Sequence, residues 1–282
     1  MIDRIREWAK HVEGLHVVVL VGSRARMGAT PDELSDHDLV LFCDDPEQFS
    51  RSDAWISGLG DPLIILPEST DLLGSTVPTR LVEYREGHRV DFTLSSRSAL
   101  RVISYLPELP PMFDLGYRVL WDPEGATGPM CPPQGRGYAG RVPEPDEILA
   151  DVREFFWETL VVGKALARGE AHAAAYSAES VMRHGLLRRI LEVRARMATG
   201  WSGHVGPTGR GLSRFLPDGL REDAAPRAAD WNDSGAWQEL DELFGCFVRV
   251  AREVCAGIGV EYPEVLEREV TERLQRIRAA RL

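Results

Sequence analysis

Three aspartates have the types and spacing needed to hold a metal ion and accept a proton. Asp36 and Asp38 flank His37 directly before an apolar run, and Asp91 interrupts a later one. Residues two apart in a strand share a face, so Asp36 and Asp38 should project together, with His37 opposite. Carboxylates that close repel each other unless a cation lies between them, and Mg²⁺ prefers such oxygen ligands. Because burying an unpaired carboxylate is costly, Asp91 should face the same polar site.

A Gly-Ser turn precedes these acids. Gly22 and Ser23 follow another apolar run, and Asp36 comes thirteen residues after Ser23. Gly22 would let the backbone pass close to a phosphate, and Ser23 with the next N–H groups could bind phosphate oxygens at a helix start. We expect Arg24 to be a further phosphate ligand; the alternative is an exposed residue of the turn. A Gly-Ser pair alone is usually a simple turn. Combined with the three acids, it predicts phosphoryl or nucleotidyl transfer with one or two Mg²⁺ ions.

The elements that must position these residues alternate between helix and strand in the first half of the chain. Apolar runs and alternation predict strands at 15–21, 38–43, 63–66 and 117–121, a hairpin of 79–86 with 88–95 around Gly87, and helices at 2–12, 46–57 and 97–106.

The second half of the chain has a different pattern. Residues 122–145 are dense in Gly and Pro and predict a linker or crossing loop. Helical spacing then predicts helices at 146–168, 172–197, 235–259 and 262–280. The fold class is therefore α+β. A mixed β-sheet domain with flanking helices is expected over 1–135, and a helical-bundle domain over 136–282.

Composition narrows the function classes. The 282 residues carry 33 Lys and Arg against 44 Asp and Glu, a net charge of −11. This excess of negative charge argues against nucleic-acid binding and favours the attraction of a cationic ligand or the binding of a metal ion. The four cysteines are scattered without a CxxC pair, as in a reduced, cytoplasmic protein. No signal peptide or run of about 18 apolar residues is present, so no membrane association is expected.

The motifs resemble a known family. The segments VVVLVGSRARMG (17–28), SDHDLVLF (35–42) and RVDFTL (89–94) resemble the polymerase-beta-type nucleotidyltransferase superfamily. More narrowly, they are similar to the aminoglycoside 6-adenylyltransferases, which modify streptomycin. FFWETLVVGKALARGE (155–170) and stretches within 210–216 and 237–263 extend this resemblance over most of the chain.

The resemblance implies a reaction and its residues. AMP would pass from ATP to an antibiotic hydroxyl, giving resistance, in a site between the two halves. Asp36, Asp38 and Asp91 correspond to the metal ligands, and Asp91 also to the catalytic base. Lys164 and Arg168 correspond to positions that face the triphosphate. One helical turn separates them, so they share a face; a solvated helix face is the alternative.

The acceptor pocket is inferred from the chemistry of streptomycin. Its guanidinium groups call for carboxylates and aromatic faces, and Glu154, Trp157 and Glu158 are the candidates. Alternatively, Trp157 lies in the core and Glu154 pairs with a surface arginine. Another aminoglycoside or a lincosamide could replace streptomycin as acceptor, and a non-catalytic partner module is the remaining alternative. We expect a monomer that binds ATP and a cationic antibiotic.

Overall fold

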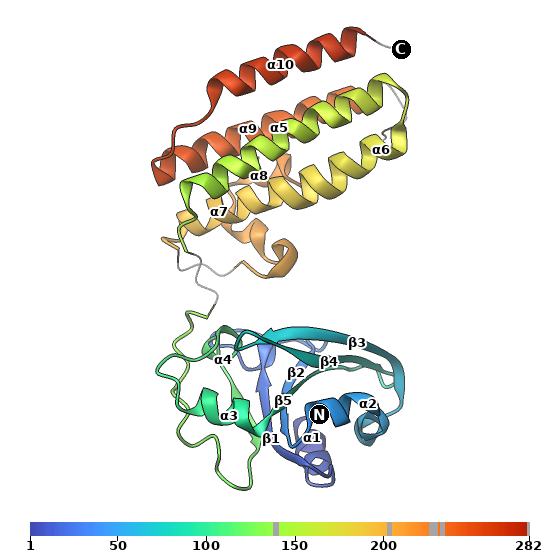
Figure 1. Ribbon diagram of the computed structural model, residues 1–282, viewed down its shortest axis with the longest axis vertical. Helices are drawn as coiled ribbons and strands as arrows, with labels where there is room; N and C mark the ends of the chain where they lie inside the picture. The colour runs from blue at the N-terminus through green and yellow to red at the C-terminus, as the bar shows by residue number, and fades with distance from the viewer. Residues whose placement is uncertain (138–140, 202–204, 226–230, 232–234, 281–282) are drawn as a thin grey trace. The chain divides into compact units, whose positions relative to one another are not determined.

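The computed structural model of the protein describes residues 1–137, 141–201, 205–225, 231 and 235–280. The chain divides into two compact units, Met1–Tyr138 and Ala139–Leu282 (Figure 1). The division lies three residues from the boundary expected between 135 and 136. The predicted linker has no helix or strand over its described residues up to 144, and its residues 138–140 lie outside the described part of the chain.

A mixed six-stranded sheet forms the first unit. Its order is β3-β4-β5-β2-β1-β6; β2 and β5 run parallel, and the other neighbours run antiparallel. The α+β prediction is confirmed. The strands are β1 (Leu15–Val21), β2 (His37–Cys43), β3 (Pro62–Leu72), β4 (Ser75–Tyr84), β5 (Arg89–Ser96) and β6 (Arg118–Trp121).

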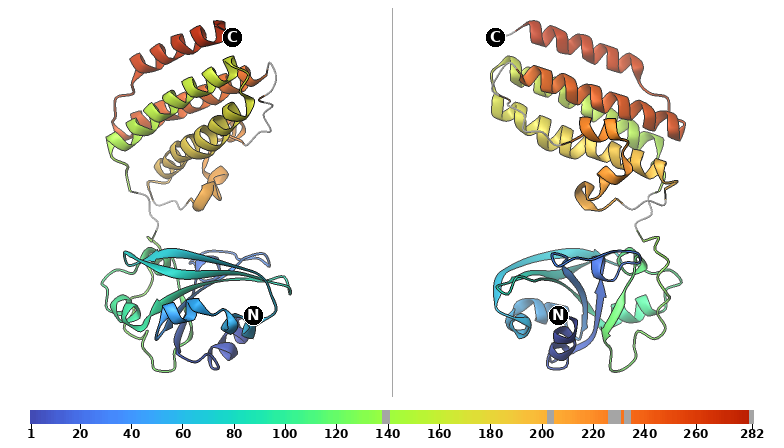
Figure 2. Two further views of the ribbon diagram at one scale, coloured as in Figure 1. Left: turned by 45° about the vertical axis from the view of Figure 1, so that its right-hand side comes forward. Right: turned by 180° about the vertical axis from the view of Figure 1, so that it is seen from behind.

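Each face of this sheet buries its own apolar cluster, as the alternation of side chains along a strand requires. In β1, Val18 and Leu20 belong to one cluster and Val19 and Val21 to the other. Figure 2 shows helices on both sides of the sheet. Helix α1 (Ile2–Ala9) and the 3-10 helix η2 (Ala54–Leu59) pack on the first face, and α3 (Arg97–Ser104) and α4 (Pro111–Asp114) pack on the second.

The predicted elements at 63–66 and 46–57 differ most from the structure; β4 also begins at Ser75, before the expected Thr79, and α1 ends at Ala9, before the expected residue 12. Strand β3 runs well beyond the expected 63–66, because it pairs with β4 along its length while most of its side chains stay exposed. The expected helix at 46–57 is two helices, α2 (Pro46–Arg51) and η2. Between them, Asp53 pairs with Arg80 of β4, with Oδ1 2.8 Å from Nε. The short helix α4 was not predicted.

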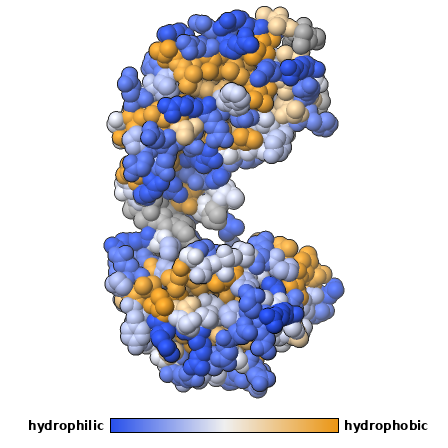
Figure 3. All heavy atoms as spheres, in the orientation of Figure 1, coloured by the Kyte–Doolittle hydropathy of each residue, from blue (hydrophilic) through white to orange (hydrophobic). Residues whose placement is uncertain are grey.

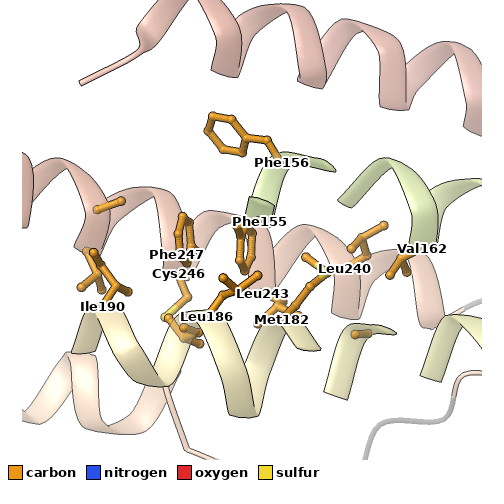
Figure 4. Packing of buried hydrophobic residues seen from close by; sticks show 14 of the residues in the cluster. Phe155, Phe156, Val162, Met182, Leu186, Ile190, Leu240, Leu243, Cys246 and Phe247 are labelled. Atoms are coloured by element: carbon orange, nitrogen blue, oxygen red, sulfur yellow. The ribbon is translucent and has the colours of Figure 1, made fainter. Parts of the chain in front are cut away.

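The second unit is the expected helical bundle. Its core stacks Phe155 on Phe247, with ring centroids 3.7 Å apart and 5° between the planes (Figure 4). The long helices are α5 (Pro145–Ala167), α7 (Arg188–Ala198), α9 (Ala236–Ile258) and α10 (Glu264–Ala279). The shorter ones are α6 (Ala171–Ala175), η4 (Pro207–Gly209), η5 (Leu212–Phe215) and α8 (Asp218–Asp223).

The predicted helix at 172–197 is divided into three segments. Between α6 and α7 the chain winds as a π-helix, η3 (Tyr176–Leu187). Apolar spacings of three and four residues match the 3.6-residue turn of an α-helix, so the sequence pattern gave no sign of the wider i→i+5 turn.

The surface mixes polar and apolar residues (Figure 3). On β3, Leu63, Ile64 and Leu66 are 48–60% exposed. Among the described residues, no helix is long and apolar enough to cross a membrane.

Candidate active site

Two of the predicted acids meet on neighbouring strands. Strands β2 and β5 are parallel and begin at the same end of the sheet, which we call the site edge. Asp38 therefore lies directly beside Asp91 in the register. Alternation places both on the face that buries Val40 and Phe42 further along β2. Strand β1 runs the opposite way and ends at the same edge, with Val21 opposite Asp38. The strand register therefore brings the Gly-Ser turn to the same edge as the acids.

An arginine joins the remaining acids of this edge. Arg89, the first residue of β5, shares a face with Asp91 and holds its carboxylate with two hydrogen bonds, Nε–Oδ1 at 2.9 Å and Nη2–Oδ2 at 3.1 Å. The same Nε lies 3.9 Å from Oδ2 of Asp36, which directly precedes β2. His37 is 6% exposed, and burial, then the charge of Arg24, lowers its pKa to about 4. The imidazole is therefore neutral near pH 7.

The carboxylate of Asp38 has a raised pKa. Burial first, then the charges of Asp91 and Asp36, raises its pKa to about 6; Arg89 and Arg26 act in the opposite direction. The folded chain thus holds more negative charge around Asp38 than its neighbouring arginines compensate. A cation bound at this edge would relieve that repulsion.

Gly22 is required by its contact with Asp38. Its φ is +67°, in the left-handed region, and a Cβ at this position would lie 1.9 Å from Oδ2 of Asp38. Any larger residue must displace the carboxylate. Ser23 is the next residue of the short 3-10 helix η1 (Gly22–Arg24). The expected helix start is therefore a single turn.

Arg24 anchors the loop that carries Asp36. Its Nε donates to the backbone oxygens of Ser35 at 3.0 Å and Asp36 at 3.2 Å, and its Nη2 donates to those of Asp32 at 3.0 Å and Ser35 at 2.7 Å. The exposed-turn alternative is wrong, because the side chain is bonded to the loop. In this arrangement Arg24 positions a predicted metal ligand.

The donor set suits Mg²⁺, although its carboxylates do not converge in this structure. Asp36, Asp38 and Asp91 supply hard oxygen donors, and the raised pKa of Asp38 marks uncompensated negative charge. Within the described residues, no three His, Cys, Asp or Glu side chains form a metal-ligating group. The Asp91 carboxylate is instead paired with Arg89.

The predicted residues of the second unit follow one side of α5. Their spacing keeps them on one stripe, on the side of the helix away from the buried Val152. Trp157 is 67% exposed, so its assignment to the core is wrong. Glu154 lies 3.5 Å from Nη2 of Arg189, as the surface-pair alternative expected. The stripe comprises Glu154, Trp157, Glu158, Lys164 and, at the helix end, Arg168, and Lys164 Nζ lies 6.0 Å from the centre of the Trp157 ring.

Two arginines of the first unit were missed from the sequence. Arg89 looks like an ordinary charged residue at the start of a strand, and its position beside Asp36 depends on the register of β2 with β5. Arg26 has a buried Nε without a hydrogen-bond partner, and its charge acts on Asp38. The only sequence signal for either is proximity to a predicted site residue.

Carboxylates on adjacent parallel strands, facing a Gly-Ser turn at the end of a third, are the arrangement of a nucleotidyltransferase. The family model for streptomycin adenylyltransferase matches residues 1–277, and the chain belongs to this family. It is accordingly an enzyme, an antibiotic-modifying adenylyltransferase.

Individual relatives are distant but extensive matches. The chain is 23% identical over 266 residues to an aminoglycoside 6-adenylyltransferase of Campylobacter jejuni, covering 93% of this chain and 89% of that protein. A Staphylococcus aureus protein of the same name is 23% identical over 194 residues, 67% of each chain. An aminoglycoside 6-adenyltransferase structure from Bacillus subtilis shares 19% identity at a TM-score of 0.46, covering 98% of this chain and 97% of that one.

Proposed function

We propose that the enzyme transfers AMP from Mg·ATP to a hydroxyl of an aminoglycoside, with the 6-position of streptomycin as the acceptor. The observation that carries the proposal is the pairing of Asp38 with Asp91 across parallel strands, beside the turn at Gly22. Membership of the streptomycin adenylyltransferase family supports an adenylyl group as the group transferred and an aminoglycoside as the acceptor.

The proposed reaction is an in-line displacement. The acceptor oxygen attacks the α-phosphorus of ATP, its proton passes to the carboxylate of Asp91, and pyrophosphate leaves. Asp36, Asp38 and Asp91 would hold Mg²⁺, which, when bound, offsets the charge of phosphates and carboxylates. Gly22 and Ser23 would receive the leaving phosphates.

The remaining predicted residues act in nucleotide and acceptor binding. Arg24 would support the nucleotide site by fixing the loop before Asp36. Lys164 and Arg168 would contact the triphosphate. The five-residue α5 stripe combines these cations with an exposed indole and two carboxylates, a combination suited to a guanidinium-bearing antibiotic.

The setting follows from the substrates. ATP is abundant in the cytoplasm, where we place the enzyme. Because each chain carries the full set of proposed ligands, we expect it to act as a monomer.

A product assay tests the proposal. The protein is incubated with ATP, Mg²⁺ and a panel of aminoglycosides and lincosamides, and products are examined for an added AMP by mass spectrometry and for pyrophosphate. Adenylylated streptomycin, modified at its 6-hydroxyl, supports the proposal. Modification of a different drug alone would replace the acceptor, and pyrophosphate-free mixtures with every acceptor would refute the proposed reaction.

A further inference from the structure

Arg89 occupies the position between two predicted metal ligands. Its guanidinium takes both oxygens of Asp91, at 2.9 and 3.1 Å, and its Nε lies 3.9 Å from Asp36. A carboxylate bonded in this side-on manner offers fewer lone pairs to a metal ion or to a substrate proton. In this state Asp91 is therefore poorly available for either role.

The surroundings allow this arginine to leave. The side chain of Arg89 is 40% exposed. Arg80, another arginine of this sheet, pairs with Asp53 and is 8% exposed. Arg80 is fixed by burial, but Arg89 can turn away without disturbing the core. Glu83, its register partner on β4, also acts on its charge and offers it a second carboxylate.

We infer that Arg89 is an exchangeable counter-ion, which neutralises Asp91 and Asp36 in the empty site and yields this position to the incoming metal ion. The inference rests on the metal role in the proposed function and deepens it. Arg89 is a positioning residue here. It keeps the carboxylates together while the site is empty, and it weakens the binding of a metal ion by competing for them.

Removing Arg89 should change stability and metal affinity in opposite directions. Loss of a nearby positive charge alone would also favour a metal ion, so a lysine, which keeps the charge, is needed to reveal competition for the carboxylate. Without the guanidinium, the metal-free protein should be less stable, because three carboxylates repel each other with one fewer cation nearby. The metal ion should nevertheless bind more tightly, since it no longer displaces a competitor. For an ion pair of this exposure we expect about a fivefold change in affinity.

The test is a Mn²⁺ titration of nucleotide-free protein, followed by electron paramagnetic resonance, with thermal unfolding in EDTA beside it. Arg89→Gln should bind Mn²⁺ about fivefold more tightly than the wild type and unfold at a lower temperature in EDTA. Arg89→Lys keeps the charge without the planar fork, so it should fall between the two. Arg85→Gln, which breaks an exposed pair with Asp61, is the matched control and should leave Mn²⁺ affinity unchanged.

The outcomes separate this inference from the proposed function. If the wild type binds Mn²⁺ and Arg89→Gln binds it equally or more weakly, the exchange is overturned while the proposed function stands. If neither binds Mn²⁺, the metal role fails and the inference with it. Should Arg89→Gln fold poorly, tighter Mn²⁺ binding by Arg89→Lys still supports the exchange, and unchanged or weaker binding overturns it.

Discussion

Replacing Asp38 with Asn should stabilise the metal-free protein while abolishing its activity. Burial and the charges of Asp91 and Asp36 raise the pKa of Asp38 from 3.8 to about 6. Each unit is about 1.4 kcal/mol, so the ionised carboxylate costs the folded protein on the order of 3 kcal/mol at neutral pH. Asn removes this charge but brings N–H groups that need partners, which leaves a net gain of about 1–3 kcal/mol, or about 5 °C in the unfolding temperature.

The pH dependence identifies the cause of the gain. The folded-state pKa lies above the unfolded value, so the folded wild type takes up a proton as the pH falls from about 6 towards 4. The wild type gains stability over that window, and the advantage of Asp38→Asn should shrink with it. Thermal unfolding in EDTA at about pH 7.5 and about pH 4.5 measures this difference directly.

Two further measurements complete the test. Mg²⁺ should raise the unfolding temperature of the wild type but not of Asp38→Asn, because a metal ligand is lost. Asp61→Asn, at an exposed carboxylate, should change stability by less than about 0.5 kcal/mol. An Asp38→Asn protein that is less stable than the wild type in EDTA, or whose gain is the same at both pH values, would refute the reasoning.

Three other substitutions test separate parts of the site. Gly22→Ala should lower kcat/KM at least 100-fold, because its Cβ would lie 1.9 Å from a carboxylate oxygen; Gly28→Ala, with φ +70° and nothing within 4 Å, should keep activity at a cost of about 1 kcal/mol. Asp91→Asn should abolish turnover while ATP affinity, measured by calorimetry, stays within tenfold; an active variant would exclude Asp91 as the base. Trp157→Ala should raise the KM for streptomycin at least tenfold without a change in unfolding temperature, and Tyr105→Ala, at a ring 74% exposed, should alter neither.

The sequence predicted the acids of the site because strand alternation fixes which side chains share a face. It did not contain the register that pairs Asp38 with Asp91, since that depends on which strands become neighbours. Gly22 was singled out for access to a phosphate, yet its closest neighbour is the Asp38 carboxylate. The sequence thus identified the right residue. The reason that only glycine fits there depends on the pairing of β1 with β2.

Charged residues were the hardest to predict. Arg24 and Arg89 have the same side chain, yet one holds a loop through backbone oxygens and the other holds a carboxylate. The strand spacing of two residues could have indicated the Arg89–Asp91 pair, but the loop partners of Arg24 and the approach of Arg89 to Asp36 depend on how separate segments meet. More of the fold than of the site could be predicted, because buried apolar runs identify most of the strands and long helices. The prediction failed where burial is weak, as along β3.

Strand β3 has a consequence for how the protein behaves in concentrated solution. It lies at the end of the sheet, and its exposed Leu63, Ile64 and Leu66 would suit a second chain adding there as a further strand. Pro67 follows directly and brings no backbone N–H, and Glu68 and Asp71 add negative charge beyond it. Two copies meeting edge to edge would encounter a missing donor and like charges. The strand thus carries its own obstacle to self-association, and replacing Pro67 would make this edge prone to aggregation.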